Sequence, residues 1–83
     1  MDFESKFLEF MRRWVVSTNC SYPTIEWAKF IGMNFPKDEY EKAQAYIEYL
    51  VEEHYIKLVD SDRGPCYAIT GYGYEMVKRG IMP

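Results

Sequence analysis

The chain offers few residues with the reactive chemistry of an active site. His54 is its only histidine, and Cys20 and Cys66 stand far apart, with no second cysteine or histidine at zinc-ligand spacing. A lone histidine at a helix end is more typical of a structural position than of a general base. No serine or cysteine has a base and an orienting acid that the sequence identifies. We therefore expect no metal, no cofactor and no catalytic activity.

Two short motifs have a partial likeness to ligand-binding loops. Residues 60–64 read Asp-Ser-Asp-Arg-Gly, but the glycine comes one position too early for a calcium loop, and no acid stands at the twelfth position. Gly71-Tyr72-Gly73 lacks the third glycine of a dinucleotide fingerprint and follows no βαβ unit. Neither motif predicts a ligand.

Length and composition favour one folded domain over residues 1–83. Hydrophobic residues at 48 % and charged residues at 28 % exclude a disordered or membrane-embedded chain. The net charge of −3 gives no general attraction for nucleic acid, and two cysteines are too few for a disulfide-stapled protein. The first residues carry acids where a signal peptide needs bases. These features predict a cytoplasmic protein with reduced thiols.

Apolar periodicity predicts three helices in the first two thirds of the chain. The first spans residues 2 to about 16, with Asp2 as its N-cap. The second is a two-turn helix that opens at Pro23-Thr24 and ends at Gly32. The third runs from Pro36 to about Glu53, and His54 follows it in the left-handed conformation that often ends helices.

The pattern then changes to that of a β-hairpin. Residues 55–59 and 66–69 are extended-type, and the turn residues between them predict a six-residue tip at 60–65. Thr70 is expected to cap a final short helix that Gly80 stops.

This order of elements, with motifs in three places, resembles the winged helix-turn-helix family. The motifs are Ile25-x-x-Ala28-x-x-Ile31-Gly32, Ile47-x-x-Leu50-(x)5-Ile56 and Tyr67-Ala68-Ile69-Thr70-Gly71-Tyr72-Gly73. The resemblance implies an α+β fold with three helices, a β-hairpin wing and a short C-terminal helix. It departs from the family at His54, where a glycine is usual.

The resemblance implies DNA binding, but the charge pattern opposes it. A winged helix places its third helix in the major groove and its hairpin tip on the DNA backbone. Residues 36–54 carry a net charge of −4, whereas the rest of the chain carries +1. At the hairpin tip, Asp60 and Asp62 outnumber Arg63. The acidic excess therefore lies on the element that would have to approach phosphates.

Two functions stay open. The leading hypothesis is a non-enzymatic regulatory protein that acts through protein contacts, and its size would suit a phage or mobile-element factor that modulates host transcription or defence. The alternative is a dimeric DNA-binding transcription regulator. The protein-binding residues would be Glu41, Gln44, Ala45, Glu48, Tyr49 and Glu52; the DNA-binding residues would be Lys37, Lys42, Gln44 and Arg63.

Aromatic residues make up 18 % of the chain, which favours a protein interface because tyrosine and tryptophan are enriched at binding hot spots. Tyr46 and Tyr49 lie off the predicted core stripe of the third helix, and a small core does not need all of Tyr22, Trp27 and Tyr72. Winged-helix relatives often dimerise through their first and last helices. The residues expected to do so here are Phe3, Phe7, Phe10, Met76, Val77 and Ile81.

Overall fold

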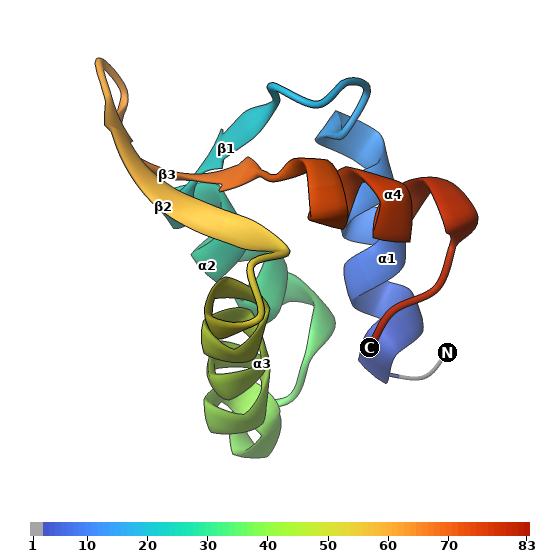
Figure 1. Ribbon diagram of the computed structural model, residues 1–83. Helices are drawn as coiled ribbons and strands as arrows, with labels where there is room; N and C mark the ends of the chain where they lie inside the picture. The colour runs from blue at the N-terminus through green and yellow to red at the C-terminus, as the bar shows by residue number, and fades with distance from the viewer. Residues whose placement is uncertain (1–2) are drawn as a thin grey trace.

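The computed structural model describes residues 3–83, which form an α+β fold with four α-helices and a small antiparallel sheet (Figure 1). The strand order in the sheet is β1-β3-β2. The elements in chain order are α1 (Phe3–Trp14), β1 (Ser21–Pro23), α2 (Thr24–Asn34), the 3-10 helix η1 (Lys37–Glu39), α3 (Tyr40–Glu52), β2 (Ile56–Ser61), β3 (Gly64–Ile69) and α4 (Gly71–Arg79). The predicted N-cap Asp2 lies outside the described residues.

The core is built where α1, α2, α3 and the sheet meet, and aromatic rings fill much of it. Phe10 stacks on Phe30 with ring centroids 4.2 Å apart, and Phe10 also meets the edge of Trp27 at 5.0 Å. Trp27 is only 1 % exposed and belongs to the core, whereas Tyr72 is exposed, so the three residues Tyr22, Trp27 and Tyr72 are indeed not all used inside. Edge-to-face and offset ring pairs of this kind add to the stabilisation from burial.

Helix α2 is longer than the sequence predicted. Gly32 does not end it, because the helix continues to Asn34 and the Phe35 amide still donates to the Ile31 carbonyl at 3.1 Å. The side chain of Asn34 donates to the Phe30 carbonyl at 2.8 Å, a local bond that adds to the last turn of the helix. The helix has three turns rather than two.

The hairpin is tighter than predicted, and a third strand joins it. Strands β2 and β3 stay paired out to Ser61 and Gly64, which leaves a two-residue tip instead of the expected six. Gly64 has φ of +93°, and the Ser61 hydroxyl donates to the Gly64 carbonyl at 2.9 Å. Strand β1, which was not predicted, pairs antiparallel with β3 and attaches the start of α2 to the sheet.

The junction between α3, β2 and α4 confirms three predictions. His54 has φ of +64° and ends α3 in the left-handed conformation. The Thr70 hydroxyl caps α4 by accepting from the Gly73 amide at 2.9 Å, and it donates to the His54 carbonyl at 2.6 Å. Gly80, with φ of +72°, ends α4. One threonine therefore ties the end of α3 to the start of α4.

The glycines at positions 73 and 32 make a matched pair for testing this packing. A Cβ at Gly73 would overlap the carbonyl oxygen of Tyr55, whereas a Cβ at Gly32 would meet nothing within 4 Å. We expect Gly73→Ala to lower the free energy of unfolding by about 3 kcal/mol because the junction must shift. Gly32→Ala, in a helix interior, should raise it by about 0.5–1 kcal/mol. Urea denaturation measures both, and equal effects would contradict the close approach at Gly73.

Candidate functional site

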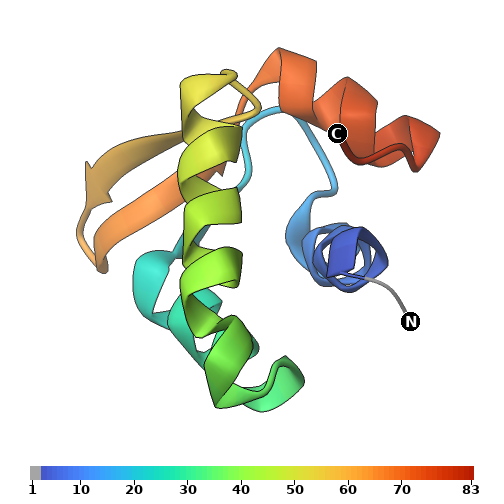
Figure 2. The ribbon, with the colours of Figure 1, turned by 90° about the horizontal axis from the view of Figure 1, so that it is seen from below.

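The outward face of α3 carries the residues that the sequence predicts to bind a protein partner. The inward face carries Ala43, Ile47 and Leu50, all buried in the core. Figure 2 shows α3 in the foreground, between the β2–β3 hairpin and helices α1 and α4. The outward face, called here the acidic face, consists of the exposed residues Glu41, Gln44, Ala45, Glu48, Tyr49 and Glu52.

The carboxylates of the acidic face are not neutralised within the described chain. Across residues 3–83, the ion pairs join Arg13 to Glu9, Lys29 to Glu26 and Arg79 to Glu75, and none involves an acid of α3. Burial raises the pKa of the Tyr67 hydroxyl on β3, and the negative charge of Glu48 raises it further. Of the acidic face, Glu48 therefore acts on a side chain of the sheet.

The structure does not bring the four residues of the DNA-binding alternative together. The Lys42 ammonium lies 4.9 Å from the centre of the Phe3 ring, so this side chain reaches toward α1. Gln44, two positions further along α3, projects from the opposite side of the helix. Lys37 lies on η1 and Arg63 at the hairpin tip, segments at opposite ends of the molecule in Figure 1.

The residues expected to form a dimer through the first and last helices belong largely to the core of one chain. Phe7, Phe10, Met76 and Val77 are all buried within one chain. Phe7 and Phe10 pack against Phe30 of α2. That prediction was wrong for these four residues, since a side chain already covered cannot form a surface. Ile81 remains exposed.

Tyr46, expected off the core stripe, is half-buried against α1. Its ring centroid lies 4.9 Å from that of Phe7 and 5.3 Å from that of Phe3, and its hydroxyl donates to the Pro83 carbonyl at 3.0 Å. Tyr49 stacks on it at 6.1 Å from the exposed side. Burial, and next the charge of Glu4, raise the pKa of Tyr46 well above its usual value. Of the two tyrosines, only Tyr49 belongs to the exposed surface.

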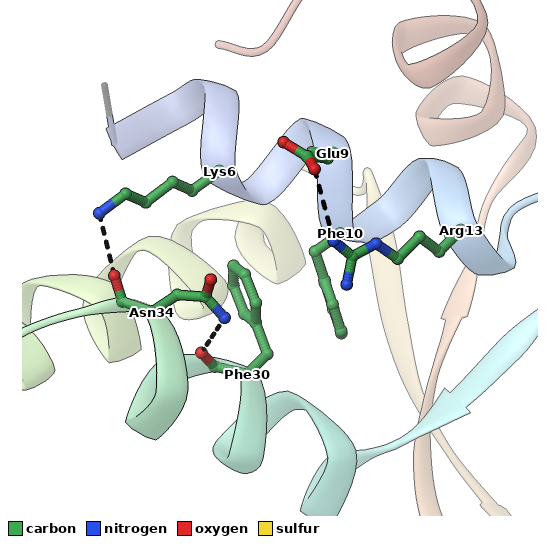
Figure 3. Close-up of a pocket in the computed structure, with 6 residues that line it drawn as sticks. All are labelled: Lys6, Glu9, Phe10, Arg13, Phe30 and Asn34. Carbon is green, nitrogen blue, oxygen red and sulfur yellow. Dashed lines mark hydrogen bonds and ion pairs between the residues drawn. The ribbon is translucent and has the colours of Figure 1, made fainter. Parts of the chain in front are cut away.

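A pocket of about 200 Å³ lies between α1 and α2, but its polar groups bond one another (Figure 3). The Lys6 ammonium donates to the Asn34 carbonyl at 2.9 Å, and Arg13 donates to the Glu9 carboxylate at 3.4 Å. Phe10 and Phe30 form its apolar wall. Because these contacts are local links within and between the two helices, the pocket supports the packing of α1 on α2.

Residues 3–83 carry neither a cluster of metal-ligating side chains nor a helix that could span a membrane. No group of three or more histidine, cysteine, aspartate or glutamate side chains is placed to hold a metal ion. Over the same residues, every helix is too short or too polar to cross a bilayer.

The sequence analysis named Tyr72, Met76 and Ile81 separately but did not predict that they line one groove. A groove along α4, of about 350 Å³, is bordered by the exposed Tyr72 and Ile81. Tyr72 stacks on Tyr55, with ring centroids 4.9 Å apart. The helical spacing of the α4 residues was visible in the sequence, but the position of the chain after Gly80 was not.

Comparison with known protein families, with curated proteins and with solved structures gives no match.

The half-buried Tyr46 makes a pH-dependent prediction. Because its pKa is raised in the folded chain, the neutral form is favoured by folding, and that stability is lost as the pH rises above about 10, the pKa of an unfolded tyrosine. The free energy of unfolding should therefore fall with pH in this range, and Tyr46→Phe should make the decline shallower. Urea denaturation at several alkaline pH values measures both slopes. An unchanged slope in the variant would contradict the burial of this side chain.

Proposed function

We propose that this chain is a non-enzymatic regulatory protein with a winged helix-turn-helix fold, which binds a basic protein surface through the acidic face of α3. The observation that carries the proposal is the set of unpaired carboxylates on an exposed helix, where a DNA-binding relative needs cations. We place its action in the cytoplasm, in line with its expected reduced thiols.

The order of elements supports the winged-helix part of the proposal. Helix α2 and helix α3 follow each other as a helix-turn-helix pair, and the β2–β3 hairpin follows α3 directly. Strand β1 lies between α1 and α2 in the chain and pairs with β3, so the sheet closes one end of the helical core. These features agree with the family motifs at 25–32, 47–56 and 67–73.

The charges of the acidic face destabilise α3 itself, which supports a role for them in binding rather than in folding. Glu48 and Glu52 are like charges four residues apart, a spacing that destabilises a helix by about 0.2–0.5 kcal/mol. Glu52 also lies in the last turn, where the helix dipole favours a cation. No ion pair within residues 3–83 offsets this cost. A local rule broken without structural compensation is typical of a functional surface.

Charge reversal on the acidic face tests the partner class. The double variant Glu41→Lys, Glu48→Lys should lose a protein that the wild type captures from lysate of the source cells, identified by mass spectrometry. The matched control Glu9→Lys, Glu26→Lys makes the same change in net charge on α1 and α2 and should retain that protein. The captured complex should weaken with salt, as expected of opposed charges.

A mobility-shift titration with duplex DNA gives the competing outcome. We expect no shift at low salt for the wild type. Binding whose logarithm falls by several units per unit of log salt would overturn the proposal in favour of the DNA-binding regulator. Equal loss of the captured protein in both double variants would also contradict it, because the effect would then follow net charge rather than the acidic face.

A single substitution separates fold from function. Glu52→Lys should raise the free energy of unfolding by about 0.5 kcal/mol, since it replaces the repulsion between Glu48 and Glu52 with a carboxylate–ammonium pair in the favourable orientation. The same variant should weaken capture of the partner. Urea denaturation and the capture experiment measure the two effects. A loss of stability would show that Glu52 serves the fold instead.

A further inference from the structure

The outer edge of strand β2 is unpaired within residues 3–83. In the sheet order β1-β3-β2, β2 pairs only with β3, and no helix runs alongside its outer side in Figure 2. The Ile69 amide of β3 donates to the Cys20 carbonyl at 2.8 Å, so the backbone groups of Ile69 point toward β1. Its partner in register, Ile56, therefore exchanges no hydrogen bond with it and points its own N–H and C=O groups outward.

The same alternation applies along the whole strand. Because successive residues of a strand point their backbone groups to opposite sides, those of Leu58 and Asp60 also face the open edge. Lys57 and Val59 bond to β3 instead. The outer side of β2 thus presents a row of free donors and acceptors, which is the template that a further strand needs.

An exposed leucine lies on the core side of this edge. Leu58 and Ile56 are two residues apart, so they share one face of the sheet, and Ile56 is buried in the core. Leu58, which pairs in register with Tyr67, is nevertheless 58 % exposed. Proteins usually protect an open edge with charge or cover it. An apolar side chain beside free backbone groups therefore favours a binding role for this edge.

Carboxylates lie on both sides of the leucine. Asp60 follows Leu58 on the same face and is exposed. Glu52 belongs to the last turn of α3, just before β2 begins. Glu48 acts on the Tyr67 hydroxyl, across the ladder from Leu58, so the acidic face lies toward this side of the sheet. No ion pair within residues 3–83 involves these three acids. An occupant of the edge that matches them carries positive charge on both sides of an apolar residue.

Resting on the proposed function, we propose that the partner of the acidic face binds through an extended segment that adds to the free edge of β2 as a fourth strand. Its backbone pairs with Leu58 and Asp60, and its alternate side chains face α3. On that face an apolar residue lies beside Leu58, with a lysine or arginine two positions before and after it. This pattern is symmetric, so it fits a parallel or an antiparallel strand. A second copy of β2 is disfavoured, because it would oppose like charges at Asp60.

Amide hydrogen exchange with a synthetic peptide tests the pairing. The probe is Thr-Lys-Thr-Leu-Thr-Lys-Thr, blocked at both ends, with its lysines and leucine on one face of a strand. In the free chain the amides of Leu58 and Asp60 should exchange fast, whereas those of Lys57 and Val59 are protected by β3. Millimolar peptide should slow exchange at Leu58 and Asp60 by about tenfold or more. No slowing at these two amides would overturn the proposal.

A peptide of the same composition is the matched control. Lys-Thr-Thr-Leu-Thr-Thr-Lys places both lysines on the face opposite the leucine, away from the carboxylates. It should bind about tenfold more weakly, as measured by fluorescence anisotropy of the labelled peptides. Equal affinity of the two peptides would contradict the charge pattern of the proposed strand.

Two substitutions at one position separate the backbone from the side chain. Leu58→Pro removes an N–H that points outward, so it leaves the β2–β3 ladder intact, as proline does on edge strands. Leu58→Thr loses the same apolar side chain but keeps the N–H. The proline variant should bind the first peptide about tenfold more weakly than the threonine variant. Slow exchange at Lys57 and Val59 confirms that both variants keep the hairpin. Equal binding by the two variants would overturn the strand addition.

The protein captured from lysate, once purified, distinguishes this proposal from the one it rests on. If Glu41→Lys with Glu48→Lys loses that protein but Leu58→Pro binds it as the wild type does, the strand addition is wrong and the acidic face still binds the partner. If the charge reversal leaves binding unchanged, both proposals are wrong. Sedimentation velocity covers the remaining occupant: a wild-type dimer that Leu58→Pro abolishes would assign the edge to a second copy and overturn the proposal.

Discussion

The contact between the first turn of α4 and the chain at residues 54–55 is the constraint on which the surfaces of this protein depend. The Thr70 hydroxyl donates to the carbonyl of His54 and lies 3.0 Å from that of Tyr55, while it accepts from the Gly73 amide. Gly73 lies so close to Tyr55 that a side chain would overlap the backbone there. These contacts fix where α4 starts relative to the end of α3. They therefore set the position of Tyr72 beside Tyr55 and, with it, the shape of the α4 groove.

The outward face of α3 depends on the same core from the other side. Ala43, Ile47 and Leu50 must face inward because the aromatic rings of α1 and α2 need their contact, and this fixes the rotation of the helix. Of the residues between them, Gln44, Ala45, Glu48 and Tyr49 are exposed, whereas Tyr46 is half-buried against α1. The helix thus presents its carboxylates in a fixed array, which is the preorganisation that a docking surface needs.

The sequence carried enough information to predict the elements whose signals are local. The cap at Thr70, the stop at Gly80 and the left-handed residue at His54 follow from side-chain chemistry and backbone conformation at single positions, and the structure confirms them. Strand β1 could not be predicted, because three residues carry no periodicity and pair only once β3 is in place. The predicted end of α2 at Gly32 was two residues too early, because a glycine ends a helix only where the packing beyond it requires a turn. The tip of the hairpin was placed too wide because Pro65 and Asp60 have turn chemistry but pair with each other.

The residues of the acidic face could be predicted from the sequence, whereas the residues of a dimer interface could not. Helical spacing alone placed the six residues of the acidic face on one side of α3, since they belong to one regular element. The prediction of the dimer residues was wrong because spacing shows that a helix has an apolar face but not whether the same chain covers that face. Phe7 and Val77 are covered by the same chain, Phe7 by the rings of Phe30 and Tyr46, whereas Tyr72 and Ile81 are exposed.

The lysines of the α3 region show why net charge understated the acidity of the outward face. Lys42 contributes to the sum over residues 36–54, yet its ammonium lies over the Phe3 ring, where a cation is attracted to the aromatic face. Lys37 lies on η1, ahead of the first turn of α3. Both cations of the segment are thus placed away from Glu48 and Glu52, and the outward face keeps only negative charge. A charge count along the sequence gives the sign of such a surface, but the side chains that pack elsewhere determine its strength.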